Sequence, residues 1–301
     1  MITQHLKNVK VSKILKFSVE DIRFPTSKDL TGSDAIHTDP DYSATYVTVY
    51  TDNDNLKGFG IAFTIGKGND IVAGCIKHFF LIFENMQLED LENNIGKLWF
   101  KCVDHSQLRW LGPEKGVVHM AVSAIFNCLW DLIAKKNKKP LWQFVVESEP
   151  ETILSWLTFK YIEDVLTPDE ALKLLQKMQI NKQERIDTIL KEGYPSYTTA
   201  AGWLGYSDEK IIQLCKEYMA KGWKHFKIKV GLDLDADVKR LELIRKTIGD
   251  DCFVMVDANQ QWSVKQSIDH INAYKKFNLF FVEEPTSPDD VMGFTKIKKE
   301  V

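Results

Sequence analysis

Two lysines, an aspartate and a glutamate occupy similar places in three strand-like segments, and together they could do chemistry. Lys227 and Lys229 alternate with apolar residues in KHFKIKV, Asp257 ends CFVMVD, and Glu283 lies near the end of LFFVEE. The segments are each about one strand–helix unit apart, the spacing of neighbouring parallel strands, whose carboxyl ends meet at one edge. Two carboxylates and two ammonium groups there would compensate each other's desolvation. The carboxylates also match a Mg²⁺ site completed by waters and an anionic substrate.

Each of these motifs also has a purely structural interpretation. A KIK strand is commonly an exposed edge strand with solvated lysines. DAN after a strand is commonly a turn, and EEP before a helix combines helix-terminal carboxylates with a proline. Their placement at the ends of consecutive strand–helix units favours the shared site.

From about residue 195 the chain alternates between helical and strand-like patterns. This alternation predicts a parallel sheet with helical crossovers, either a (β/α) barrel or a doubly wound sheet. No GxGxxG or GxxxxGK[ST] motif opens these helices, which favours the barrel, and about four of its strands precede Val301. The expected elements are helix 207–222, strand 226–230, helix 235–249, strand 252–257, a helix with a capping box at Ser263 and Gln266, strand 279–284, and a last helix starting near Ser287 and Pro288.

The first part of the chain has an α+β pattern. The turn-rich DNDNLKG separates two strand-like runs, as in a hairpin. The polar stretch TSKDLTGSDAIHTDPDY (26–42) is a long loop, which suits a lid or binding loop as well as mobile surface. We expect strands at 11–24, 44–52 and 58–66, a buried helix at 117–136, and a further long helical stretch at 169–193.

Composition excludes several classes of protein. The 301 residues include 44% hydrophobic and 27% charged residues, as in a globular protein. A net charge of −3 and a pI near 6.2 do not suit nucleic acid as a partner, and no apolar run approaches the roughly 18–20 residues of a membrane span. The five cysteines are scattered along the chain, which predicts buried free thiols rather than disulfides or a zinc site. The lysine-containing N-terminus reads as a weak mitochondrial address or as a strand, so the expected location is mitochondrial or cytoplasmic.

The motifs resemble the mandelate-racemase-like branch of the enolase superfamily, and within it the L-fuconate dehydratases. The resemblance covers essentially the whole chain. It implies an α+β capping domain over 1–150, with a lid loop at 25–43, followed by a (β/α) TIM-type barrel over 151–301 of which only about half is present. The segments that carry it are KIK (227–229), VDANQ (256–260), VEEPT (282–286), RFPTS (23–27), GSDAIHTDPDYSA (32–44), QLRWLGPEKGVVH (107–119), CLWDL (128–132), GYPSYTTAAGWLGYSDE (193–209) and EEPTSPDD (283–290).

The resemblance implies a role for each candidate residue. Lys229 would be the base that removes the proton α to the substrate carboxylate, and Lys227 would contact that carboxylate. Asp257 and Glu283 would be two of three Mg²⁺ ligands, with Asn259 supporting the site. The lid residues that would recognise the acid sugar are Gly32, Ser33, Asp34 and Tyr42.

The implied reaction is Mg²⁺-dependent dehydration of an acid sugar such as L-fuconate to a 2-keto-3-deoxy acid. The third carboxylate ligand and an acid/base histidine of this family would lie beyond Val301, so we expect residues 1–301 alone to show no turnover. A barrel open at its last strand would expose an edge that forms homo-oligomers or associates with other chains. The alternative function is therefore a catalytically inactive binding or regulatory partner.

Overall fold

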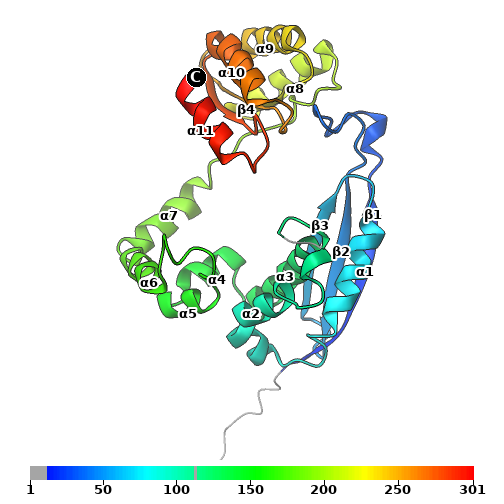
Figure 1. The fold of residues 1–301 in the computed structure, drawn as a ribbon, viewed down its shortest axis with the longest axis vertical. Helices are drawn as coiled ribbons and strands as arrows, with labels where there is room; N and C mark the ends of the chain where they lie inside the picture. Colours follow the sequence, from blue (N-terminus) through cyan, green and yellow to red (C-terminus); the bar gives the residue numbers. More distant parts are fainter. Residues whose placement is uncertain (1–11, 112–113) are drawn as a thin grey trace, which may run out of the picture. The chain divides into compact units, whose positions relative to one another are not determined.

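A computed structural model describes residues 12–111 and 114–301. The chain divides into two compact units (Figure 1). The first comprises Met1–Arg23 and Ser43–Lys191, and the second comprises Phe24–Tyr42 and Glu192–Val301. The candidate N-terminal address lies largely outside the described residues.

The first unit contains an antiparallel sheet in the order β1-β2-β3. Its strands are β1 (Ile14–Arg23), β2 (Ser43–Thr51) and β3 (Lys57–Thr64), close to the predicted ranges. Val47 and Val49 alternate with their neighbours along β2 and are fully buried in the core of this unit. The expected hairpin of β2 and β3 is confirmed.

Helix α3 (Val117–Lys136) lies directly on β3. A Cβ at Gly60 would approach the carbonyl oxygen of Ala124 to 2.2 Å, so only glycine allows this helix to come so close. By length and composition α3 could also span a membrane, which corrects the expectation that no apolar run reaches that length. Its apolar side chains instead fill the core of the first unit, as predicted for a buried helix.

The first unit continues through further helices to Lys191, beyond the predicted domain boundary at 150. Trp156, just after this boundary, packs against Trp130 of α3 with ring centroids 4.9 Å apart, and this contact ties the later helices to the first unit. These helices are α1 (Asn69–Phe80), α2 (Leu88–Val103), α4 (Leu141–Glu147), α5 (Pro150–Ser155), α6 (Pro168–Lys177) and α7 (Lys182–Glu192).

Helices α6 and α7 replace the single long helical stretch predicted over 169–193. The chain breaks between them, and Asn181 adopts a left-handed backbone with φ of 54°. Arg185 donates hydrogen bonds to the carbonyls of Ile180, at 2.8 Å, and Met178 in this break. The periodicity of apolar residues continues across the break, which is why the sequence pattern did not reveal it.

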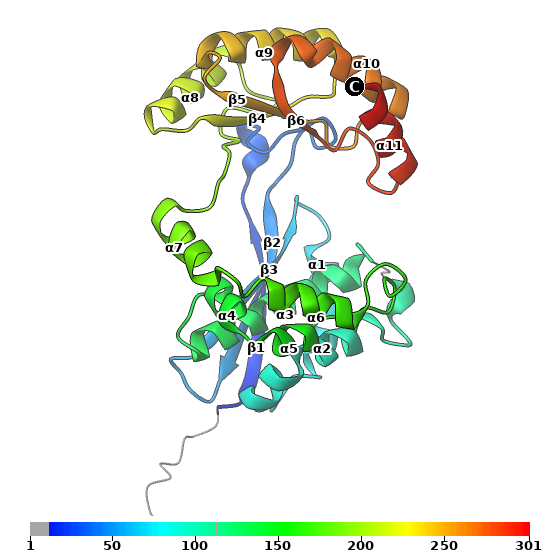
Figure 2. The same cartoon turned by 90° about the vertical axis from the view of Figure 1, so that its left-hand side faces the viewer.

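The second unit contains a parallel sheet in the order β4-β5-β6. The described residues thus form three barrel strands where about four were expected, and only an isolated parallel bridge from Thr198 to Phe226 lies beside β4. Helices α8, α9 and α10 cover one face of this sheet (Figure 2). The elements are α8 (Asp208–Ala220), β4 (His225–Lys229), α9 (Leu234–Ile248), β5 (Phe253–Asp257), α10 (Val264–Tyr274), β6 (Leu279–Glu283) and α11 (Val291–Glu300).

Helix caps in the second unit test the predicted helix ends. Ser263 and Gln266 form the predicted capping box at the start of α10, and α9 ends at Gly249 as expected. Helix α11 starts later than predicted, because the side chain of Asp290 accepts a 2.7 Å hydrogen bond from the Gly293 amide and sets the first turn.

Strand β6 departs from simple alternation. The pairing of β5 with β6 shifts between Val254 and Met255, so Phe280 bulges out of register. Leu279 therefore packs with the helix-facing core, whereas simple alternation along the strand would place it on the face of Glu283. Phe280 instead approaches Phe253, with ring centroids 5.3 Å apart.

Residues 24–42, hereafter the lid loop, belong to the second unit rather than to the predicted capping domain. The lid loop, all of whose residues the structure describes, contains one 3₁₀ turn, Thr26–Lys28. The Ser33 carbonyl accepts a 3.2 Å hydrogen bond from the Leu204 amide, and the hydroxyls of Thr31 and Tyr206 lie 2.8 Å apart. These contacts place the loop on the barrel-type unit. A loop that covers the C-terminal ends of the parallel strands is expected to lie there.

Candidate active site

The register of β4, β5 and β6 brings the predicted charged residues side by side. Lys229 is the pairing partner of Asp257, and Asp257 is the partner of Glu283. Parallel strands in this register present their C-terminal residues at one edge. The structure therefore unites the residues that the sequence placed on separate strands.

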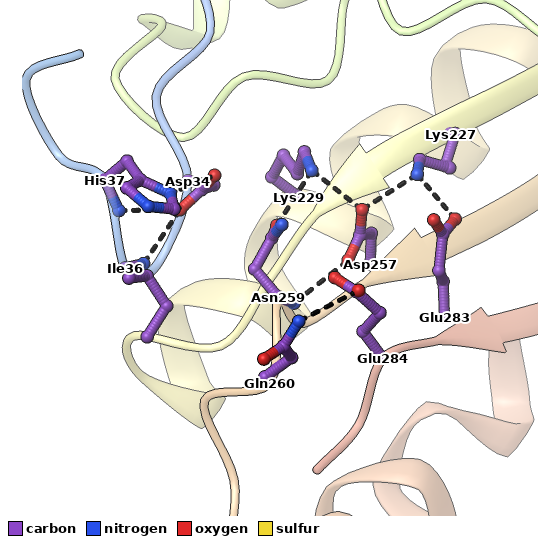
Figure 3. Close-up of polar contacts among 10 residues, drawn as sticks. All are labelled: Asp34, Ile36, His37, Lys227, Lys229, Asp257, Asn259, Gln260, Glu283 and Glu284. Atoms are coloured by element: carbon purple, nitrogen blue, oxygen red, sulfur yellow. Dashed lines mark hydrogen bonds and ion pairs between the residues drawn. The ribbon is translucent and has the colours of Figure 1, made fainter. Parts of the chain in front are cut away.

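The four side chains form one network of charge-assisted hydrogen bonds (Figure 3). The Nζ of Lys227 donates to Asp257 Oδ2 at 2.8 Å and to Glu283 Oε2 at 2.5 Å. The Nζ of Lys229 donates to the same Asp257 oxygen at 2.7 Å and to Asn259 Oδ1 at 2.8 Å. Asp257 is thus the centre of the network and joins both ammonium groups.

Burial makes these contacts strong. Lys227 is 6% exposed, Lys229 8% and Asp257 2%. Burial alone raises the pKa of Asp257, but the hydrogen bonds from both lysines and from the Asn259 amide outweigh it and lower the pKa below its ordinary value. Burial likewise works to lower the pKa of Lys227, yet its bonds to Asp257 and Glu283 raise it. Lys227 therefore stays cationic, and the lysines are not solvated edge residues.

The backbone beyond β5 and β6 holds the network in place. Asn259, Gln260 and Glu284 have positive φ values of 47°, 66° and 45°, which are uncommon for residues other than glycine. The Gln260 amide donates to the Glu284 carbonyl at 2.7 Å, and its side chain donates to Glu284 Oε1 at 3.0 Å. These bonds tie the two strand ends together and aim the Asn259 side chain at Lys229.

The four predicted lid residues contact the lid loop itself and the neighbouring residues 203–205. Gly32 has φ of 89°, and a Cβ there would lie 2.4 Å from the ring of Tyr42. Ser33 Oγ accepts a 2.9 Å hydrogen bond from the Gly205 amide. Asp34 accepts bonds from the amides of Ile36 and His37 within the loop, at 2.8 and 2.7 Å. Their predicted contact with substrate stays a prediction.

Two aromatic rings near the lysines were missed from the sequence. The Lys227 ammonium lies 5.3 Å from the centroid of Tyr197, and the Lys229 ammonium lies 5.7 Å from that of Trp203. The ring of Tyr42 meets Trp203 edge-on at 6.4 Å. Both missed residues fall within the segment 193–209 that carried the family resemblance, but only the folded chain brings them to the lysines.

The donor set suits a magnesium ion. Asp257 Oδ2 and Glu283 Oε2 accept hydrogen bonds from the same Lys227 nitrogen, at 2.8 and 2.5 Å, so the two carboxylates face one position that the ammonium occupies here. Mg²⁺ is commonly held by one or two protein carboxylates with waters and substrate oxygens. Within the described residues, no three Asp, Glu, His or Cys side chains gather as a metal site. Asp257 and Glu283 are the two carboxylates that would hold the ion.

Comparisons with known proteins agree with this fold. The family model "Enolase C-terminal domain-like" matches residues 210–301. Mitochondrial enolase superfamily member 1 of Xenopus laevis is 47% identical over 96% of this chain and 65% of its own length. L-galactonate dehydratase of Hypocrea jecorina is 45% identical over 95% of this chain and 64% of its own length. The crystal structure of the human member 1 has a TM-score of 0.93 at 46% identity, covering 96% of this chain and 66% of that one.

A more distant structure shares the fold alone. It is a racemase from Streptomyces coelicolor with bound magnesium, with a TM-score of 0.68 at 24% identity, covering 95% of this chain and 66% of its own. A capping α+β unit joined to parallel strands with charged ends defines a barrel-type enzyme fold with a capping domain. Within that class, the chain belongs to the enolase superfamily. It spans about 65% of the length of the curated relatives it matches.

Proposed function

We propose that this site takes part in Mg²⁺-dependent dehydration of an acid sugar. The observation that carries the proposal is the convergence of Lys227, Lys229, Asp257 and Glu283 at the C-terminal ends of consecutive parallel strands. The superfamily relatives with named activities include acid-sugar dehydratases. A bound Mg²⁺ would stabilise the negative charge that develops on the substrate carboxylate when its α-proton leaves.

The lysines have different roles in this reaction. In the network of the structure, Asp257 and Glu283 raise the pKa of Lys227 and keep it charged. In the proposed reaction this ammonium group binds the substrate carboxylate. Lys229 is the group that accepts the α-proton, and Asn259 and Asp257 fix the position of its nitrogen. The electrons of the C–H bond form a double bond as the β-carbon–oxygen bond breaks. The hydroxyl leaves as water with a proton from a general acid, the role that the family resemblance gives to a histidine beyond Val301. Lys229 returns its proton to solvent, and the enol tautomerises to a 2-keto-3-deoxy acid.

The proposed substrate class rests on the configuration that two acid sugars share. The family resemblance pointed to L-fuconate, and the Hypocrea jecorina relative is named an L-galactonate dehydratase. L-fuconate is 6-deoxy-L-galactonate, so the two acids have the same configuration at C2 to C5. We therefore propose acid sugars of the L-galacto configuration as substrates.

A panel of acids tests this function. Residues 1–301 and a chimera that continues into the further segment of the L-galactonate dehydratase would be incubated with Mg²⁺ and L-fuconate, L-galactonate or the mirror-image D-galactonate. We expect the chimera to form a 2-keto-3-deoxy acid, seen by NMR, from the two L-acids only, and to stop when the metal is chelated. We expect no turnover by residues 1–301 alone. A folded chimera that leaves both L-acids intact would contradict the proposal.

A second candidate function, association with another chain segment, rests on the open side of the sheet. Among the described residues, β6 pairs with β5 only. Phe280 at its bulge is 60% exposed, and Phe253 beside it is 44% exposed. Such an edge with exposed aromatic rings is suited to a further parallel strand–helix segment. We propose that it takes the part of the barrel that the longer relatives contain and this chain does not span, in the same chain or in another.

Mixing experiments measure this association. The last third of the human relative, added to residues 1–301, should form a one-to-one complex in size-exclusion chromatography with light scattering. Phe280→Glu should weaken the complex at least tenfold, because it places a charge in the apolar contact. Phe294→Glu on α11 of the same unit is the matched control and should bind normally. Equal weakening by both, or a dimer without the added segment, would contradict the proposed occupant.

The expected location, mitochondrial or cytoplasmic, stays a proposal. Its support is the word "mitochondrial" in the names of the relatives from Xenopus laevis and human. Fractionation of cells that express the protein would decide between the two compartments.

A further inference from the structure

The lid loop is attached to the second unit by a short turn, residues 203–206. The Leu204 amide donates to the Ser33 carbonyl at 3.2 Å, and the Gly205 amide donates to Ser33 Oγ at 2.9 Å. The Tyr206 hydroxyl adds the contact with Thr31. Consecutive residues of one turn therefore hold the middle of the lid loop.

The opposite side of this turn is held by a single side chain from α9. Arg240 donates from Nη1 to the Trp203 carbonyl at 3.1 Å and from Nη2 to the Leu204 carbonyl at 2.7 Å. The guanidinium is a planar fork with fixed donor directions, so two bonds from it set the orientation of both carbonyls.

The two sets of bonds act across the same peptide planes. In a trans peptide, the carbonyl of one residue and the amide N–H of the next point in opposite directions. The Trp203 carbonyl faces Arg240, so the Leu204 N–H faces away from it, toward Ser33. The Leu204 carbonyl and the Gly205 N–H repeat this arrangement. Each bond from Arg240 therefore orients one bond to the lid loop.

The turn also places an aromatic ring beside the site. The ring of Trp203 lies 5.7 Å from the Lys229 ammonium and 6.4 Å from the ring of Tyr42 in the lid loop. A shift of this turn would move the ring and the loop together. Arg240 lies on α9, outside the lysine–carboxylate network, and the family resemblance assigned it no role.

We propose that Arg240 is a positioning residue that locks the lid loop against the strand ends by orienting the 203–206 turn. Its importance for acid-sugar chemistry rests on the proposed function, but the lock itself is a property of the folded chain. A structural alternative is that Arg240 merely satisfies carbonyls at the surface of the core. The two differ in where the chain loosens when the guanidinium is lost.

Hydrogen–deuterium exchange of residues 1–301, measured by mass spectrometry, separates these alternatives. Arg240→Met should speed exchange of peptides covering 24–42 and 203–206 by about ten- to a hundredfold, as expected for losing two hydrogen bonds from a charged donor. Arg240→Lys, with a point charge in place of the fork, should give a smaller increase.

Arg245 on the same helix provides a matched control. It donates to the carbonyls of Cys252 and Phe277, each at 2.7 Å, near the other end of α9. Arg245→Met should loosen peptides around these carbonyls and leave the lid loop unchanged. The inference is wrong if Arg240→Met leaves lid exchange at the wild-type rate, or if Arg245→Met loosens the lid equally.

A kinetic measurement connects the lock to function. In the active chimera, Arg240→Met should raise KM for the acid sugar about tenfold or more, with a smaller change in kcat, because the lid loop is loosened while the lysines are untouched. If the chimera has no activity, the exchange experiment still decides on the lock. Failure of the proposed function and failure of the lock are thus separate results.

Discussion

Replacing Lys229 by alanine is expected to slow exchange of the substrate α-proton with solvent by about 10²–10⁴-fold, the usual loss when a general base is removed. The Lys229 nitrogen is buried and is held by Asp257 Oδ2 at 2.7 Å and Asn259 Oδ1 at 2.8 Å, so no other amine can take its position without moving the network. Exchange would be followed by NMR in D₂O with the active chimera and L-galactonate. Proton exchange reports on the base itself, even where loss of the hydroxyl is slower.

Lys224 offers the matched control for this experiment. It is an exposed lysine just before β4, and its carbonyl accepts the Phe253 amide at 2.8 Å, an interaction that alanine keeps. Lys224→Ala should therefore exchange the α-proton at the wild-type rate. Normal exchange in Lys229→Ala would move the role of base to another group. An equal loss in both variants would indicate damage to the strand rather than loss of a base.

Local rules predicted the elements that carry the site. Alternation of charged and apolar residues located β4, and the capping box at Ser263 located the start of α10. The parallel arrangement followed from the strand–helix periodicity, so the meeting of Lys229 with Asp257 could be predicted before the structure. These features depend on residues a few positions apart and on one rule of sheet topology, which is why they can be read from a single sequence.

Features that depend on distant contacts could not be predicted. The bulge at Phe280 places Leu279 on the helix-facing side, although alternation along β6 gave no sign of it. The first unit ends at Lys191 rather than at 150, because the contact between Trp156 and Trp130 attaches the later helices to it. The spacing of residues in the sequence does not reveal such a contact. The role of Arg240 depends on carbonyls more than thirty positions earlier in the chain. Such long-range pairs are fixed by packing of the whole unit, not by local propensity.

Replacing Asp257 by asparagine is expected to lower the free energy of unfolding of the second unit by about 3–5 kcal/mol at pH 7. The Asp257 carboxylate is the shared acceptor of two buried ammonium groups. Asparagine keeps one oxygen but presents an NH₂ group and no charge, which leaves Lys229 without a buried anion to compensate it. Hydrogen exchange of the most protected amides in β4 and β5 would measure the loss for this unit alone.

A surface pair in the same unit is the control. Asp269 pairs with Lys265 at 2.6 Å, but the two side chains are 54% and 86% exposed, so Asp269→Asn should cost less than about 1 kcal/mol. Removing Lys229 as well, in Asp257→Asn with Lys229→Met, should recover part of the loss, because the uncompensated charge is then gone. A loss below about 1 kcal/mol for Asp257→Asn, or no recovery in the double variant, would mean that the ion pairs are not the source of stability.

The dependence of this loss on pH follows from the two pKa shifts. The lysines and the Asn259 amide lower the pKa of Asp257 against the opposing effect of burial, so its contribution is full above the ordinary value of 3.8 and is lost as pH falls through the folded pKa. The pKa of Lys227 is raised, so its contribution is full below the ordinary value of 10.5 and is lost as pH rises through the folded pKa. The difference in unfolding free energy between wild type and Asp257→Asn should therefore be largest from about pH 5 to pH 9 and shrink on both sides. A difference that stays constant down to pH 3 would mean that the carboxylate charge does not hold the lysines in place.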